Sequence, residues 1–237
     1  MPHEIPFPAR SLARRGICAT VLLLAGCSSA SMFQSNFDRT PVGNPPAAGQ
    51  RAGTLNIYGS PDSVLVADDQ TGETDHWLQI GRSGIQSGQA GAQGILARSA
   101  GDGKYTFYAH LFMPSDGGIA TIDFEPNQPG AAPPPSFLRL DLTRDNDIEI
   151  DGDQSTKFGW YPRNQIFVLK VTLTINGTAP IAHVSLSGFG ARGARDYYIV
   201  PGSWVLAQQF GAVRLALAGS APGAFFASDI KVKAGRG

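Results

Sequence analysis

Polar side chains that can hydrogen-bond a ligand or transfer a proton alternate with apolar ones in the segment Thr121-Ile122-Asp123-Phe124-Glu125. Residues two apart on an extended strand point to the same side. Asp123 and Glu125 would therefore share one face, while Ile122 and Phe124 turn toward a core. Two carboxylates on one strand face can accept hydrogen bonds, or serve as the acid and base of a hydrolysis.

The same alternation predicts further polar residues on such faces. Arg139 alternates with leucines, and Tyr108 and His110 alternate with Phe107 and Ala109. Arginine offers charged hydrogen bonds, and a tyrosine ring can pack against the apolar side of a ligand. We expect one groove to gather the ligand-binding residues Tyr108, His110, Asp123, Glu125 and Arg139.

Short strands must position these side chains. From residue 54 onward the hydrophobic period is two, and the chain's 29 glycines and 17 prolines suit turns rather than long helices. The glycine-rich run 81–94 predicts a flexible surface loop. The number of strands and the turn spacing predict an all-β antiparallel sandwich or barrel. The expected strands are 105–113, 118–125, 137–142, 147–150, 167–175, 181–187, 213–217 and 226–232.

The first residues have the order of a bacterial export signal. Three arginines precede an apolar run, 16–25, that is too short to cross a bilayer as a helix. The run ends in Leu24-Ala25-Gly26-Cys27, which resembles the lipobox of bacterial lipoproteins. That resemblance implies cleavage before Cys27 and lipid on its thiol. Ser28, in place of an aspartate, implies sorting to the outer membrane of the cell envelope. An ordinary secretory signal is the alternative.

These observations divide the chain into three parts. A signal peptide is expected over 1–26, and the lipidated cysteine with a flexible tether rich in Ser, Pro, Ala and Gly over 27–53. The β-sandwich domain is expected over 54–237.

Composition excludes several classes of function. The formal net charge of +0 argues against a nucleic-acid partner, which would need a basic face. Both cysteines lie in the first thirty residues, so the body has no disulfide and no cysteine-based metal site. The acidic segment 141–153 predicts a hairpin at Asp151-Gly152, with calcium binding as the alternative. No cofactor and no metal are predicted.

The two closing strands, Phe210–Leu215 and Phe226–Val232, resemble the last strands of concanavalin A-like (laminin G-like) jelly rolls. The stretch 160–175 resembles the same family, with an aromatic residue before a long strand and a hairpin. The resemblance implies a jelly-roll sandwich whose concave face binds or cuts glycans. Galactose-binding-type jelly rolls end similarly and remain the alternative.

The segment around Asp123 is similar to the Glu-x-Asp-x-Glu strand of laminarinase-type β-glucanases. Asp123 and Glu125 match the helper and acid/base positions of that family, but Thr121 replaces the nucleophile. A threonine cannot act as that carboxylate, so no catalytic residue is predicted.

The sequence thus favours a non-catalytic, lipid-anchored module that recognises polysaccharide or another envelope component. A glycan-active enzyme is the first alternative, and Tyr108, His110 and Arg139 would supply a lyase. A structural lipoprotein whose partner is an envelope protein is the second alternative.

Overall fold

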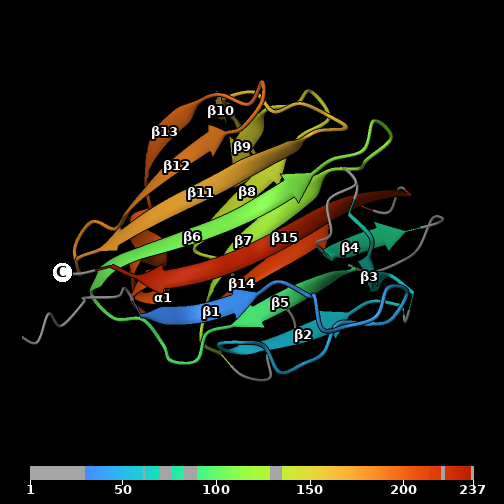
Figure 1. The fold of residues 1–237 in the computed structure, drawn as a ribbon. Helices are drawn as coiled ribbons and strands as arrows, with labels where there is room; N and C mark the ends of the chain where they lie inside the picture. The colour runs from blue at the N-terminus through green and yellow to red at the C-terminus, as the bar shows by residue number, and fades with distance from the viewer. Residues whose placement is uncertain are drawn as a thin grey trace, which may run out of the picture.

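The computed structural model describes residues 30–60, 62–69, 76–82, 90–128, 135–219 and 222–235. Two antiparallel sheets pack face to face, and Figure 1 is viewed onto the sheet called here the front sheet. The front sheet runs in the order β13 (Ala194–Tyr198), β12 (Ile181–Ser187), β11 (Ile166–Ile175), β6 (Gly103–Phe112), β15 (Gly223–Ala234), β4 (Trp77–Arg82), β3 (Val64–Ala67), with β1 (Ser31–Ser35) paired to β15. The rear sheet runs β10 (Asp153–Phe158), β9 (Ile148–Ile150), β8 (Leu138–Leu142), β7 (Ala120–Pro126), β14 (Phe210–Leu217), β5 (Gly91–Ile95), β2 (Thr54–Tyr58). A short 3-10 turn, η1 (Pro201–Ser203), and a short helix, α1 (Trp204–Gln208), precede β14.

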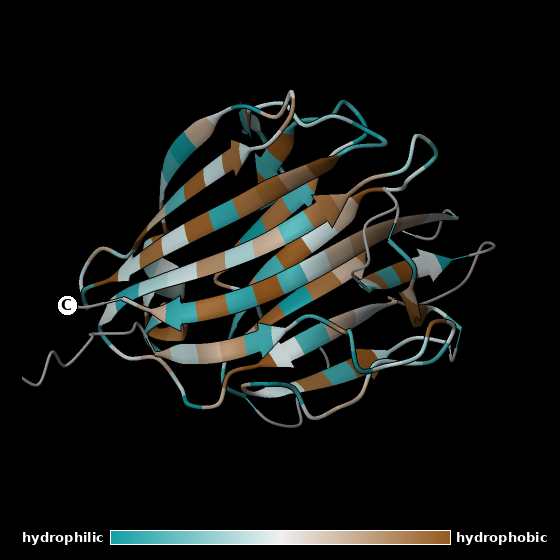
Figure 2. Ribbon diagram, in the orientation of Figure 1, coloured by the Kyte–Doolittle hydropathy of each residue, from teal (hydrophilic) through white to brown (hydrophobic). Residues whose placement is uncertain are grey.

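The core lies between the sheets, because each strand turns its apolar alternate residues inward. On β11, Leu169 and Val171 are fully buried while Lys170 between them is exposed. Figure 2 shows the resulting bands of brown and pale or teal colour along the strands. Phe107 of β6 meets Phe124 of β7 edge to face across the sandwich, with ring centroids 5.5 Å apart. The predicted all-β antiparallel sandwich is confirmed.

The segment after Cys27 corrects the predicted domain boundary. Ser31–Ser35 forms β1 beside β15, and Met32 and Phe33 are each only 1% exposed. The tether predicted for 27–53 is therefore wrong from Ser31 onward, and the sandwich begins there instead of at residue 54. The strand is not recognisable from sequence because the segment is mostly polar and the strand contributes only two large apolar residues to the core. The signal peptide predicted for 1–26 and the acylation site Cys27 lie outside the described residues.

The glycine-rich run also differs from the prediction. Its last residues form β5, a strand inside the rear sheet between β2 and β14. A side chain at Gly91 would come within 2.8 Å of the Tyr58 ring, and one at Gly94 within 2.9 Å of the Phe33 ring. These glycines are needed because neighbouring aromatic side chains cover the strand closely. Residues 83–89 of the run lie outside the described residues.

The acidic segment forms the predicted hairpin. Strands β9 and β10 are joined through Asp151 and Gly152, whose φ angles of 54° and 73° suit a tight hairpin turn. Within the described part of the chain, no group of three or more His, Cys, Asp or Glu side chains could hold a metal ion. In the same residues, no helix is long and apolar enough to cross a membrane.

Candidate functional site

The outward face of the rear sheet carries a row of polar side chains across five neighbouring strands. Backbone pairing places Asn56, Gln93, Arg214, Asp123 and Arg139 side by side on β2, β5, β14, β7 and β8. Glu125, Asp141, Glu149 and Tyr58 share this outward face because they alternate with inward residues. We call this surface the charged face; it consists of Tyr58, Gln93, Asp123, Glu125, Arg139, Asp141, Glu149 and Arg214.

One half of the charged face is closed to solvent and centred on Arg214. The Arg214 guanidinium contacts two carboxylates, with Nη2 3.1 Å from Asp123 Oδ2 and Nε 2.8 Å from Glu125 Oε1. Gln93 Nε2 donates a hydrogen bond of 2.6 Å to Glu125 Oε2. The Glu125 side chain is fully buried, and those of Asp123 and Arg214 are 4% and 9% exposed. This closed half is a buried ion cluster on the side of the sheet away from the core.

Burial sets the proton affinities in the closed half. It raises the pKa of the Glu125 carboxyl above its ordinary value, and the negative charge of Asp123 adds to that shift. The Gln93 hydrogen bond and the Arg214 charge act against the shift. Burial also raises the pKa of the Tyr58 hydroxyl, while nearby Arg214 opposes the increase. Perturbed acids of this kind gather at functional sites.

The position of Arg214 limits the chemistry available to the two carboxylates. A glycosidase holds its carboxyl groups about 5–9.5 Å apart with the sugar acetal and water between them. Here one guanidinium contacts both Asp123 and Glu125. The third outward residue of β7, Thr121, lies with its hydroxyl 3.5 Å from the Ala216 carbonyl oxygen. This arrangement suits a rigid hydrogen-bonding floor better than a bond-cleaving pair.

The other half of the charged face is open. The Arg139 side chain is 39% exposed, and its Nε lies 2.8 Å from Asp141 Oδ1. Burial raises the pKa of Asp141, against the lowering effect of Arg139. Lys157 Nζ lies 3.3 Å from Glu149 Oε1 at the far edge. This open half is formed by Arg139, Asp141 and Glu149 and is bordered by Lys157 of β10. Arg139 is its most exposed member, since the Asp141 and Glu149 side chains are 9% and 15% exposed.

Two of the five predicted site residues lie elsewhere. Tyr108 and His110 are on β6 in the front sheet, where the Tyr108 hydroxyl lies 2.7 Å from His110 Nε2. Their side chains point out of the front sheet, away from the charged face. The predicted convergence on a single groove is therefore wrong: the structure brings together only Asp123, Glu125 and Arg139. Alternation identifies the side of a strand toward which a residue points, but not the sheet to which the strand belongs. Because Tyr108 and His110 lie on the other sheet from Arg139, these three residues cannot form the active site of a lyase together.

Five residues of the charged face were not among the predicted site residues. Asp141 and Glu149 lie in the acidic segment, which was interpreted as a hairpin, and the other three are Tyr58, Gln93 and Arg214. Arg214 is the one charged residue in the otherwise apolar strand Phe210–Leu217, and that isolated charge was the signal available. Gln93 was hidden in the glycine-rich run, and Tyr58 lies on the edge strand β2, which no clear alternation marked.

Comparisons with known proteins agree with this architecture. No family model and no curated protein matches the sequence. Among solved structures, a lectin complexed with galactose aligns with a TM-score of 0.52 at 10% identity, covering 87% of this chain and all of that chain. The catalytic domain of a glycoside hydrolase family 131 protein from Coprinopsis cinerea aligns with a TM-score of 0.54 at 10% identity, covering 86% of this chain and 94% of that chain.

A structure from work on endo-acting O-glycanases, with which human gut microbiota initiate mucin breakdown, aligns with a TM-score of 0.52. It has 12% identity and covers 87% of this chain and all of that chain. The fold is a lectin-like jelly roll. At these identities the likeness is one of fold, and it agrees with the concanavalin A-like resemblance of the closing strands.

Proposed function

We propose that this protein is a lipid-anchored envelope lipoprotein whose jelly-roll sandwich binds a glycan on the charged face. The observation that carries the proposal is the buried cluster of Arg214, Asp123 and Glu125 on the outward side of the central strands. Burying charged groups is costly, and well-packed apolar residues at such positions are often at least as stabilising. A role in binding therefore explains this cluster better than a contribution to stability does.

The open half offers chemistry that suits sugars. Arg139 provides several N–H donors, while Asp141 and Glu149 provide acceptors on neighbouring strands. Such alternating donors and acceptors match the adjacent hydroxyls of a sugar ring, and Arg139 also suits a uronic acid carboxylate. The structurally similar proteins include a lectin and a glycoside hydrolase domain, which supports a glycan as the ligand class.

Binding without cleavage follows from the closed half. Because Arg214 contacts both carboxylates, Asp123 and Glu125 hold the floor of the site rather than flank a glycosidic bond. The test is a glycan array, followed by titration calorimetry of the lipid-free mature chain, made with Cys27→Ser. Losing a charged hydrogen bond costs about 1.5–3 kcal/mol, so Arg139→Ala should weaken binding about ten- to hundredfold.

The control is Tyr108→Ala, on the front sheet, which should leave the affinity unchanged. Binding that depends on Tyr108 and not on Arg139 would overturn the assignment to the charged face. A mature chain that binds no glycan on the array would overturn the ligand class and favour a structural lipoprotein.

One observation favours a second function, a glycan-active enzyme. The raised pKa of Glu125 is the property of a general acid that stays protonated at higher pH. The measurement is release of reducing sugar, together with the ultraviolet absorbance of unsaturated lyase products, over glucans, alginates and uronans. Turnover by the pure protein that disappears in Glu125→Gln would replace the binding module with an enzyme.

The anchor is supported by the lipobox-like residues before Cys27. Labelled palmitate, with and without globomycin, tests acylation in the producing bacterium. Wild-type protein should take up label, whereas Cys27→Ala should not and should be released from membranes. A wild-type protein without label would overturn the lipoprotein and the outer-membrane location with it.

A further inference from the structure

The start of the described chain and an exposed apolar patch lie at the same end of the sandwich. The Ala234 amide donates a hydrogen bond to the Ala30 carbonyl, and Ala234 pairs with Tyr105 at the start of β6. The preceding residue of β6, Lys104, pairs with β11, and the same ladder continues through β12 to Tyr198, the last residue of β13. In Figure 1 this is the left end, where β1 begins and α1 lies.

The patch at this end consists of Tyr198, Val200 and Val205, which are 70%, 49% and 64% exposed. Among the described residues, these are three of the seven large hydrophobic side chains that are exposed. The patch is held in place by its neighbours, because Trp204 Nε1 donates to the Ile199 carbonyl at 2.7 Å. Gln208 Nε2 also donates to the Gly177 carbonyl, in the loop between β11 and β12, at 3.1 Å.

Three basic side chains lie at this end of the sandwich. Arg98, Lys104 and Lys233 are exposed here, together with two exposed acids, Asp102 and Asp196, of which Asp196 pairs with His183. Apolar and aromatic side chains with flanking lysine and arginine form the usual composition of a surface that rests on the headgroup region of a bilayer.

The sequence leaves little room for a spacer. Cys27 precedes Ala30 by three residues, and an extended chain spans at most about 3.6 Å per residue, so the Cα atoms of the two residues can be at most about 11 Å apart. We infer that the patch Tyr198, Val200 and Val205 rests directly on the phospholipid surface. The sandwich then stands with its strands steep to the bilayer and its charged face to the side. This inference depends on the proposed lipid anchor at Cys27.

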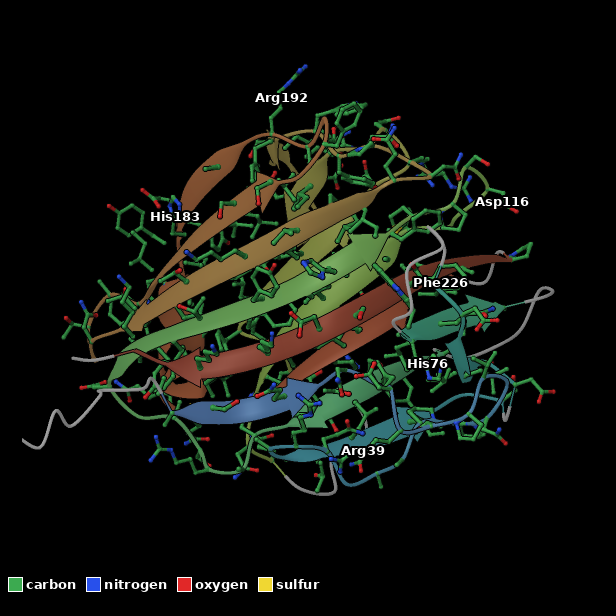
Figure 3. All side chains as sticks on the ribbon, in the orientation of Figure 1. Arg39, His76, Asp116, His183, Arg192 and Phe226 are labelled. Atoms are coloured by element: carbon green, nitrogen blue, oxygen red, sulfur yellow. The ribbon has the colours of Figure 1, made fainter. Side chains whose placement is uncertain are left out.

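The opposite end supplies a matched reference position. Phe189, in the turn between β12 and β13, is 82% exposed. The same turn contains Arg192, whose guanidinium lies 5.9 Å from the Trp160 ring centre and which Figure 3 shows at the top, far from the left end. Phe189 is more exposed than Val205 and would point away from the membrane.

The test uses the lipidated mature protein in vesicles of phosphatidylethanolamine and phosphatidylglycerol. Cys27 is the only cysteine after the leader, and acylation blocks it, so an added cysteine gives a single labelling site. Val205→Cys and Phe189→Cys are each labelled with an environment-sensitive fluorophore. The label at 205 should shift to the blue and lose emission when doxyl-labelled lipid is included, while the label at 189 should be quenched by aqueous iodide instead.

Equal iodide quenching at both positions, in protein that carries labelled palmitate, would overturn the membrane contact and leave the anchor intact. A label at 205 that is shielded from iodide but not quenched by doxyl lipid would mean that another protein chain covers the patch, which also overturns it. Protein that takes up no palmitate and stays off the vesicles removes the anchor itself, and the inference with it.

Discussion

The two outward faces of the sandwich differ in how they hold their charges. On the rear sheet, Arg214, Asp123 and Glu125 form a cluster almost closed to water. On the front sheet, Lys231 and Asp229 pair with 25% and 30% of their side chains exposed. The distances between opposite charges are short on both faces. Only the Arg214 cluster, however, is almost completely shielded from water. The comparison shows that burial, rather than the presence of an ion pair, distinguishes the closed half of the charged face from an ordinary polar surface.

The largest expected difference between the faces comes from deleting one cation on each. Arg214→Ala leaves two buried carboxylates without their shared counter-charge, and breaking a buried ion pair costs about 3–5 kcal/mol of unfolding free energy. Lys231→Ala removes a partly hydrated pair, which contributes only about 0–1 kcal/mol. Urea unfolding of both variants measures the two values. Similar losses would mean that the closed half of the charged face is not held by its charges.

A smaller difference is expected in the pH dependence. Because the pKa of Glu125 is raised above 4.5 in the folded state, its contribution to stability is present below that value and is lost as the pH rises through the raised pKa. Glu125→Gln cannot titrate, so its stability relative to the wild type should increase as the pH rises through this window. Denaturant unfolding at a series of pH values between acid and neutral measures the trend.

Asp153 is the control with the opposite sign. Its hydrogen bonds with Ser155 lower the pKa of the Asp153 carboxyl below 3.8, so its contribution is present above that value and lost as the pH falls. Asp153→Asn should therefore lose stability relative to the wild type as the pH rises from the acid side. The same slope for both variants would contradict the burial of Glu125.

The strands with long, regular alternation could be predicted from sequence. The five apolar residues from Phe167 to Ile175 fix both the strand β11 and its buried side, and Ile181–Ser187 follows as β12 with the predicted bounds. Asp123 and Glu125 were placed outside the core for the same reason, because each residue of a strand faces opposite to its neighbours.

The rest depends on contacts between distant segments. The pattern of β6 and that of β7 are equally regular, so nothing local assigns Tyr108 and Asp123 to different sheets. Gly91 and Gly94 belong to a strand because Tyr58 and Phe33 pack over them, and neither neighbour is near in sequence. Met32 and Phe33 look like isolated residues of a polar linker until β15 offers a partner strand.

The smallest expected difference in unfolding free energy is between the removal of one tyrosine hydroxyl on each face. The Tyr108 hydroxyl lies 2.7 Å from His110 Nε2, so Tyr108→Phe should cost about 0.5–1.5 kcal/mol, the net value of one hydrogen bond. The buried Tyr58 hydroxyl makes no hydrogen bond to another described residue, and Tyr58→Phe removes a desolvated polar group without breaking a pair. That change should be neutral or slightly stabilising, because an unsatisfied buried hydroxyl is itself a cost. Urea unfolding of the two variants under one buffer condition gives the comparison, and glycan titration should show no change for Tyr108→Phe. A Tyr58→Phe variant that loses as much stability as Tyr108→Phe would mean that the Tyr58 hydroxyl has a hydrogen-bond partner after all.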